Sequence, residues 1–202
     1  MGLWESGTTR PLWRHLIAGV DEVGRGALFG PVVAAAALVS ESDLERLAGL
    51  GVCDSKQLSA KRRQHLYPQV LAAVVDCQIG WSSPAEIDRL NILQASLLAM
   101  RRAVIRLKPQ PGLCWVDGNQ QIPQLPIPQQ TWIKGDQESM AIAAASIVAK
   151  VWRDRLIIRL AQRYPQYDLA ANKGYGSARH RKAIQQCGPT RYHRHSFKPC
   201  QI

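Results

Sequence analysis

The chain has 202 residues, of which 46% are hydrophobic, so it can bury one sizeable core without disulfide or metal support. Its formal charge of +11, from 26 lysines and arginines against 15 acidic residues, favours a polyanionic partner such as nucleic acid. No segment approaches the roughly 18 consecutive apolar residues that span a bilayer, and the five cysteines form no CxxC pair, which argues against a membrane protein and against a structural zinc site.

These features predict one domain over residues 15–202, in which residues 165–202 form a basic part. We expect the preceding leader, residues 1–14, to be disordered. The leader lacks the continuous apolar segment of a secretion signal, so we expect a cytoplasmic protein with reduced thiols. We also expect a monomer that needs no small-molecule cofactor.

The first predicted element is an apolar run over residues 16–20, which ends on Asp21 and Glu22 and is followed by glycines. That pattern is typical of a buried strand that breaks into a glycine turn. A second apolar run, residues 31–39, predicts the other strand of a hairpin. The turn superficially matches a dinucleotide-binding loop, but a pyrophosphate there would meet two carboxylates. Such a loop also needs a helix after it, where this chain has a strand.

The middle of the chain predicts helices that alternate with strands. Helical patterns cover residues 42–50, 60–75 and 92–107, with a further helical stretch from Pro84, and strand patterns cover residues 78–82 and 113–117. The last of these strands resembles the first, because it also ends on a carboxylate beside glycine, Asp117. Residues 120–130 contain three prolines and predict a loop or an edge strand.

Another carboxylate, Asp136, lies between a strand candidate at residues 131–133 and the longest predicted helix, at about residues 138–164. Small residues in its first turns would let this helix lie close against a sheet. Taken alone, Asp136 is better interpreted as the N-cap of that helix. A glycine turn at residues 173–176 and a helix at about residues 177–187 follow. Strands flanked by helices predict an α/β domain.

The acidic residues at these element ends suggest a metal site: Asp21 with Glu22, Asp117 and Asp136. Carboxylates crowded together raise one another's pKa unless cations compensate them, and oxygen-only ligands suit Mg²⁺ or Mn²⁺. In a basic protein, two such ions about 3.5–4 Å apart favour phosphodiester hydrolysis. Adjacent strand residues point to opposite faces. Both residues of the first pair therefore reach one site only if the strand deforms at Gly24, or if one acts through its backbone carbonyl or a bound water.

Five short motifs follow one another along the chain. They are residues 20–26 (VDEVGRG), 54–56 (DSK), 116–119 (VDGN), 134–136 (KGD) with the run at 145–150 (ASIVAK), and 173–176 (KGYG). In this order and approximate spacing they resemble type-2 ribonuclease H, over nearly the whole chain from about residue 17 to residue 197. The resemblance implies a ribonuclease H-like fold, with a central mixed sheet flanked by helices and a small helical C-terminal extension that helps to hold the duplex.

By the same resemblance, the chain would be an endonuclease that hydrolyses the RNA strand of RNA–DNA hybrids. It would also cut 5′ of single ribonucleotides in duplex DNA, leaving 3′-hydroxyl and 5′-phosphate ends, as in ribonucleotide excision repair. Asp21, Glu22, Asp117 and Asp136 fall on the four carboxylates of the family that hold two Mg²⁺ or Mn²⁺ ions.

The resemblance also implies how the substrate is recognised. Gly24, Arg25 and Gly26 fall on a turn whose backbone reads the ribose 2′-hydroxyl at an RNA-to-DNA junction. Glycines permit such a close approach, and the 2′-hydroxyl is the group that distinguishes RNA from DNA. Tyr175 falls on the tyrosine that packs against that nucleotide. Without its flanking motif, Tyr175 would be interpreted as an ordinary surface aromatic residue.

Two further predictions concern polar segments. Ser55 and Lys56 resemble a phosphate-contacting loop, for which a solvated turn is the alternative. His193 and His195 receive no catalytic role, because a histidine in so basic a tail is typically a phosphate contact or a surface residue.

Two rival functions remain open. A nuclease or resolvase of the same fold could cut branched DNA, but that chemistry needs no reader of the 2′-hydroxyl. A non-catalytic hybrid-binding module would share the basic charge, but each carboxylate near phosphate would weaken its binding unless a metal offset it.

Overall fold

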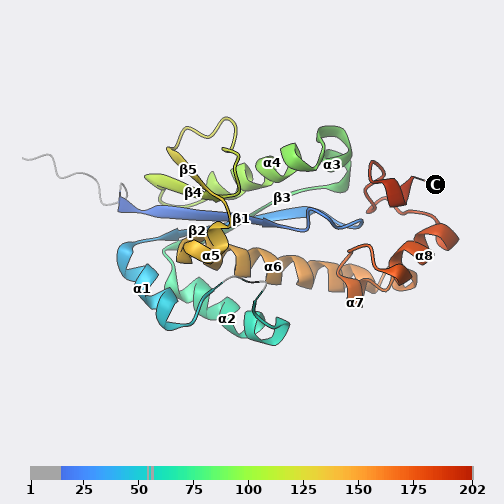
Figure 1. Ribbon diagram of the computed structural model, residues 1–202, viewed down its shortest axis with the longest axis horizontal. Coiled ribbons are helices and arrows are strands. Elements are labelled where there is room, and N and C mark those ends of the chain that lie inside the picture. Colours follow the sequence, from blue (N-terminus) through green and yellow to red (C-terminus); the bar gives the residue numbers. More distant parts are fainter. Residues whose placement is uncertain (1–14, 54, 56, 202) are drawn as a thin grey trace, which may run out of the picture.

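The computed structural model describes residues 15–53, 55 and 57–201, and it has a central sheet with helices on both faces (Figure 1). The five strands are ordered β3-β2-β1-β4-β5 in the sheet. They are β1 (Ile17–Val23), β2 (Val32–Val39), β3 (Asp76–Ser82), β4 (Leu113–Asp117) and β5 (Gln129–Trp132). The helices are α1 (Glu41–Gly49), α2 (Ala60–Ala73), α3 (Pro84–Leu90), α4 (Ile92–Val104), α5 (Gly135–Glu138), α6 (Met140–Ala161), α7 (Leu169–Asn172) and α8 (Ala178–Cys187), with short 3-10 turns η2 (Pro165–Tyr167) and η3 (Lys198–Cys200).

The sheet is mixed, which confirms the predicted α/β fold class. Strand β2 pairs antiparallel with β1 and β3, whereas β4 runs parallel to β1 and β5. Helix α4, with α3 beside it, packs on one face, and α6 packs on the other, with α1 and α2 against it (Figure 1). Every residue of β2 is buried because helices cover both faces of the sheet.

Small residues let α6 lie directly against β1. A Cβ atom on Gly19 would come within 2.1 Å of the Ala141 carbonyl carbon, so only glycine permits this approach. The alanines in the first half of α6 are buried at 0 to 1% exposure, as the sequence predicted. This tight packing fixes the position of α6 relative to the residues that follow Gly19 in β1.

The long helix begins and ends inside its predicted range of residues 138–164. Its N-cap is Ser139, whose Oγ accepts a hydrogen bond from the Ile142 N–H, and the extended backbone of Ser139 separates α5 from α6. The interpretation of Asp136 as this cap is therefore wrong. At the other end, Pro165 disfavours helical backbone in the residue before it, and Tyr164 is indeed non-helical.

Strand β1 is longer than predicted. It continues through Asp21 and Glu22 as far as Val23, because β2 pairs with it up to the Val23–Val33 position. The sequence suggested that the strand ends at residue 20. The first two carboxylates therefore lie within a paired strand, which holds their backbone rigidly.

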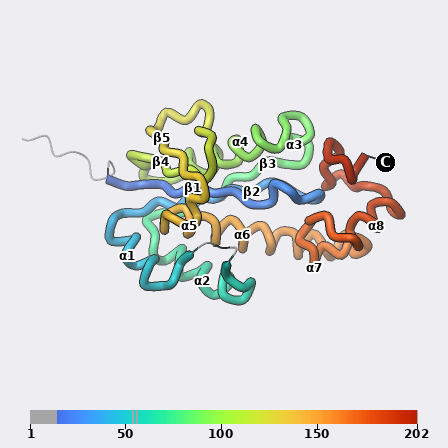
Figure 2. The backbone as a smooth tube through the Cα atoms, viewed as in Figure 1, coloured from blue at the N-terminus to red at the C-terminus, as the bar shows by residue number. Residues whose placement is uncertain are grey.

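The C-terminal part packs against the turn between β1 and β2 (Figure 2). Isolated β-bridges join Ala27 to Tyr175 and Phe29 to His193. His193 is fully buried, with its ring edge-on to Phe29 at a centroid distance of 5.0 Å, so its prediction as a surface residue or phosphate contact is wrong. The bridge to Phe29 places His193 in the interior, whereas His195 is exposed.

Among the described residues, no helix combines the length and apolar character needed to cross a membrane. The five cysteines are free thiols. The expectation for the leader concerns residues 1–14, which lie outside the described residues.

Candidate active site

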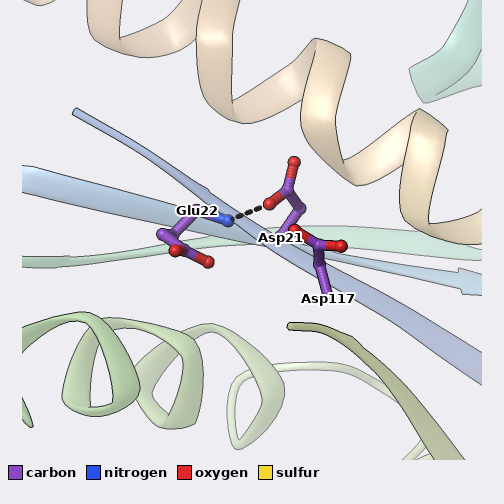
Figure 3. A group of neighbouring side chains, drawn as sticks. All are labelled: Asp21, Glu22 and Asp117. Atoms are coloured by element: carbon purple, nitrogen blue, oxygen red, sulfur yellow. Dashed lines mark hydrogen bonds between the residues drawn. The ribbon is translucent and has the colours of Figure 1, made fainter. Parts of the chain in front are cut away.

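Three carboxylates meet where β1 and β4 lie side by side. The two strands are parallel with Val20 opposite Val116, so the next residue of each strand is an aspartate, Asp21 and Asp117. One oxygen each from Asp21, Glu22 and Asp117 can be chosen so that all three lie within 4.8 Å of one another (Figure 3). The strand register thus explains why two aspartates almost a hundred residues apart in sequence share one site.

Adjacent residues of one strand supply two of these carboxylates. In Figure 3, Asp21 and Glu22 leave β1 in different directions, and the Asp117 carboxylate lies near that of Asp21. The Glu22 N–H donates to Asp21 Oδ1 at 2.7 Å, which holds the Asp21 carboxylate close to the strand. The side chains of both residues reach the group while β1 stays paired, so neither a deformation of the strand at Gly24 nor a backbone carbonyl or bound water is needed to bring them together.

The group carries an unfavourable excess of negative charge. Burial first, then the charges of Glu22 and Asp117, raise the pKa of Asp21 well above its usual value. Burial also raises the pKa of Glu22, although Arg25 opposes this with Nη1 3.1 Å from Glu22 Oε1. Both shifts mean that the folded chain resists full ionisation of this group.

The donor set fits a divalent cation. Glu22 Oε2 is buried and has no hydrogen-bond partner among the described residues. A bound cation would give that oxygen a ligand contact and would offset the charge that raises both pKa values. Carboxylate oxygens are the ligands that Mg²⁺ and Mn²⁺ prefer.

Asp136 lies outside this group of three carboxylates. It is buried, at 2% exposure, in the single turn of α5. The residue before it, Gly135, donates its N–H to Asp117 Oδ1 at 2.8 Å. Helix α5 therefore orients Asp117 through its backbone and holds Asp136 one residue further along the chain.

The glycine-arginine turn and Tyr175 line the same cavity as the carboxylates. The cavity has a volume of about 350 Å³, and its lining includes Gly24, Arg25, Gly26 and Tyr175. Gly24 has a φ of +89°, and a Cβ atom there would lie 2.2 Å from Arg153 Nε. Both the backbone conformation and the lack of space therefore require glycine at this position. The structure thus brings the predicted turn, the tyrosine and three of the four predicted carboxylates together.

Ser55 also lines the cavity, and its Oγ lies 2.7 Å from Ser146 Oγ. Ser146 in turn hydrogen-bonds Asp21 and opposes the rise of its pKa. The other residue of the predicted phosphate loop, Lys56, lies outside the described residues.

Sequence reasoning missed three polar residues that line the cavity, Arg63, Ser146 and Lys150. The last two are four residues apart on α6 and therefore share one face of the helix, a signal that was present in the sequence. Arg63 had no such signal. It comes from α2, and its Nη1 donates to the Ser55 carbonyl at 2.6 Å, which holds Ser55 beside the cavity.

Comparisons with known proteins agree on one family. A sequence model of the family described as Ribonuclease HII matches residues 18–200. The ribonuclease HII of Acaryochloris marina is 64% identical over 185 residues, 92% of this chain and 93% of that protein. The ribonuclease HII of Trichodesmium erythraeum is 62% identical over 190 residues, 94% of this chain and 90% of that protein. Among solved structures, the ribonuclease H2 of Pyrococcus horikoshii has a TM-score of 0.79 at 29% identity, over 92% of this chain and 95% of that chain.

Proposed function

The chain belongs to the ribonuclease HII family, and from this premise we propose that it is a divalent-metal-dependent endonuclease that acts on RNA–DNA hybrids and on single ribonucleotides in duplex DNA. Membership of the family implies a nuclease of the ribonuclease H type. The observation that carries the finer proposal is one cavity that holds three mutually close carboxylates, a peptide turn and a tyrosine in a chain of charge +11.

Asp21, Glu22 and Asp117 would hold the metal, and Asp136 would complete the set from α5. The chemistry that two bound Mg²⁺ or Mn²⁺ ions would supply there is activation of a water and stabilisation of the leaving oxygen of an in-line displacement. Gly135 keeps the Asp117 carboxylate turned toward the group through its N–H. The Ser146 hydroxyl stabilises the charged form of Asp21.

Other residues of the cavity would bind the nucleic acid. Lys150 and Arg63 place positive charge beside the carboxylates, where the phosphates of a bound strand must pass. The Nζ atom of Lys150 lies 2.9 Å from Asp154 Oδ1. The peptide groups of Gly24, Arg25 and Gly26 would contact the ribose 2′-hydroxyl. Tyr175 would stack on the nucleotide beside the scissile phosphate. Ser55 and Lys56 would contact the backbone of the substrate.

This arrangement favours a defined product. Water would attack the phosphate 5′ of the ribonucleotide, with the preceding 3′-oxygen as leaving group, so the ends would be a 3′-hydroxyl and a 5′-phosphate. We further propose that the chain acts as a cytoplasmic monomer in the removal of ribonucleotides from DNA.

Two rival functions are less well supported. A resolvase of the same fold would not need the turn and the tyrosine beside its carboxylates. A non-catalytic binding module would gain nothing from a buried acidic group, because its carboxylates are costly to bury and repel phosphate when they are ionised.

Metal-dependent cleavage tests the proposal. A labelled duplex with one ribonucleotide, and a continuous RNA–DNA hybrid, would be incubated with the protein in Mg²⁺, in Mn²⁺ and in EDTA. We expect both substrates to be cut with either metal and neither to be cut in EDTA. Undiminished cutting in EDTA would contradict the proposal, and so would a lack of cutting under all three conditions.

A further inference from the structure

Two arginines are completely buried between the sheet and the C-terminal part. Arg153 comes from α6 and Arg194 from the segment after α8, and both side chains are 0% exposed. Neither lines the cavity with the carboxylates. Within the described residues, neither forms a salt bridge, so backbone carbonyl dipoles are their main partners.

Arg194 contacts the turn between β1 and β2 on the side away from the cavity. Its Nη1 donates to the Arg25 carbonyl at 2.6 Å and its Nη2 to the Gly24 carbonyl at 2.7 Å. Its Nε donates to the Gly30 carbonyl at 3.1 Å. One planar guanidinium thus fixes three peptide groups of the turn, which a lysine ammonium could not match in geometry.

Arg153 connects this turn with the segment that carries Tyr175. Its Nη2 donates to the Phe29 carbonyl at 2.9 Å, and its Nε to the Pro31 carbonyl at 3.0 Å. Its Nη1 reaches across to the Lys173 carbonyl at 2.9 Å, and its guanidinium carbon lies 5.5 Å from the centre of the Tyr175 ring. This side chain therefore ties the turn to the tyrosine segment, beside the direct backbone bridge between Ala27 and Tyr175.

Stability is a poor explanation for this arrangement. Burial lowers the pKa of both guanidinium groups, and the charge of Arg153 lowers that of Arg194 further. Burying charged groups is unfavourable, and well-packed apolar side chains commonly stabilise a fold as well or better. What apolar residues cannot do is orient peptide groups.

The orientation has a consequence on the cavity side. The carbonyls of Gly24 and Arg25 point inward to Arg194. In the part of the chain that the structure describes, the backbone N–H groups of Arg25 and Gly26 donate no hydrogen bond, and both residues line the cavity. These two N–H groups of the turn can therefore donate hydrogen bonds to an oxygen of a ligand.

From this geometry we infer that Arg194 and Arg153 are positioning residues for substrate specificity: they hold the turn and Tyr175 in the one arrangement that accepts a ribose 2′-hydroxyl. The substrate named in this inference rests on the proposed function. The rigid arrangement of the turn and Tyr175 does not, because it can be measured in the free protein.

The test uses Arg194→Lys and Arg153→Lys, which keep the charge and remove the planar fork. Arg155→Lys is the matched control, because Arg155 is exposed on the same helix as Arg153 and stacks on Tyr67. For each protein, kcat/KM would be measured on a duplex with one ribonucleotide and on a continuous hybrid. Amide hydrogen exchange of residues 24–31 and 173–176 would be measured in the free protein.

We expect each test variant to lose about ten- to a hundredfold in kcat/KM on the single ribonucleotide. The loss on the continuous hybrid should be several-fold smaller, because that substrate offers a 2′-hydroxyl at every position. Exchange in both segments should become faster, and the control should match the wild-type chain in both measurements. If one variant fails to fold, the other applies the same test.

Two results would overturn the inference. Equal losses on the two substrates would mean that the arginines only support the fold, and unchanged exchange in both variants would mean that they do not hold the turn. A wild-type chain that cleaves neither substrate would instead contradict the proposed function, and the exchange measurement would still decide whether the arginines hold the turn.

Discussion

The acidic group and the turn region beside it handle buried charge in opposite ways. Around Asp21, Glu22 and Asp117, negative charge accumulates with too little compensation, and the pKa values of Asp21 and Glu22 rise. Around the turn, buried guanidinium groups are distributed over backbone carbonyls, and no carboxylate pairs with them among the described residues. Carboxylates without a compensating charge can bind cations. Guanidinium groups that donate to backbone carbonyls instead hold the turn in a fixed conformation. The first arrangement suits chemistry and the second suits recognition.

Removing one acid should have the largest effect. Asp21→Asn should lower turnover at least about a hundredfold, because it removes a ligand charge from the metal site, and it should leave hybrid binding largely intact. Asp136→Asn should do the same if Asp136 completes the ligand set. Single-turnover cleavage and binding in EDTA measure the two quantities separately.

Glu41→Gln is a suitable control for these variants, because Glu41 is an exposed acid at the start of α1. A near-native rate for Asp21→Asn would remove that residue from the site. A near-native rate for Asp136→Asn would limit the ligand set to the three carboxylates that lie together.

On the recognition side, Tyr175→Ala should lower cleavage at a single ribonucleotide by about ten- to a hundredfold, since stacking is typically worth about 1–3 kcal/mol per base. Duplex affinity and its salt dependence should change little, because they are set by contacts of lysine and arginine with phosphate. Equal losses on one ribonucleotide and on a continuous hybrid would mean that Tyr175 only supports the fold.

The smallest expected effect concerns a buried histidine pair that holds the Tyr175 backbone. The Thr190 N–H donates to His193 Nδ1 at 2.9 Å, so His193 Nε2 carries the proton and donates to His180 Nε2 at 3.1 Å. His180 Nδ1 then donates to the Tyr175 carbonyl at 2.9 Å. An added proton has no acceptor between the two rings. Burial first, then the charges of His180 and His195, lower the pKa of His193 to about 4.

Because the folded chain binds this proton less readily than the unfolded chain, stability should fall as the pH drops from about 6.5 to about 4 and then level off. We expect a loss of about 1–2 kcal/mol from His193, after allowance for solvent screening. Denaturant unfolding at several pH values measures it, with His193→Gln as the variant and His65→Gln, on the exposed side of α2, as the control. The same pH dependence in the wild-type chain and in His193→Gln would refute this assignment.

The sequence predicted the acidic region better than the turn region. Asp117 followed from an apolar run that ends on a carboxylate, and the strand register then explains its meeting with Asp21. The role proposed for Tyr175 came from the family motif alone, since nothing local distinguishes a tyrosine in a basic loop. Asp136 stays a prediction as the fourth ligand.

The arginines could not be predicted, because Arg153 reaches carbonyls 122 and 124 residues away and Arg194 reaches one 170 residues away. Backbone acceptors at such separations leave no pattern in sequence, and an arginine is expected to be exposed. His193 was misjudged for the same reason, since its burial depends on a bridge to Phe29.

We propose that the acidic group binds metal beside a turn and a tyrosine that recognise the 2′-hydroxyl. The most direct test is product analysis at nucleotide resolution on a duplex with one ribonucleotide, next to the same duplex with deoxyribose at that position, in Mn²⁺. We predict one cut, on the 5′ side of the ribonucleotide, with 3′-hydroxyl and 5′-phosphate ends, and no cut in the all-DNA duplex. A 2′,3′-cyclic phosphate end, or equal cutting of the two duplexes, would contradict the account.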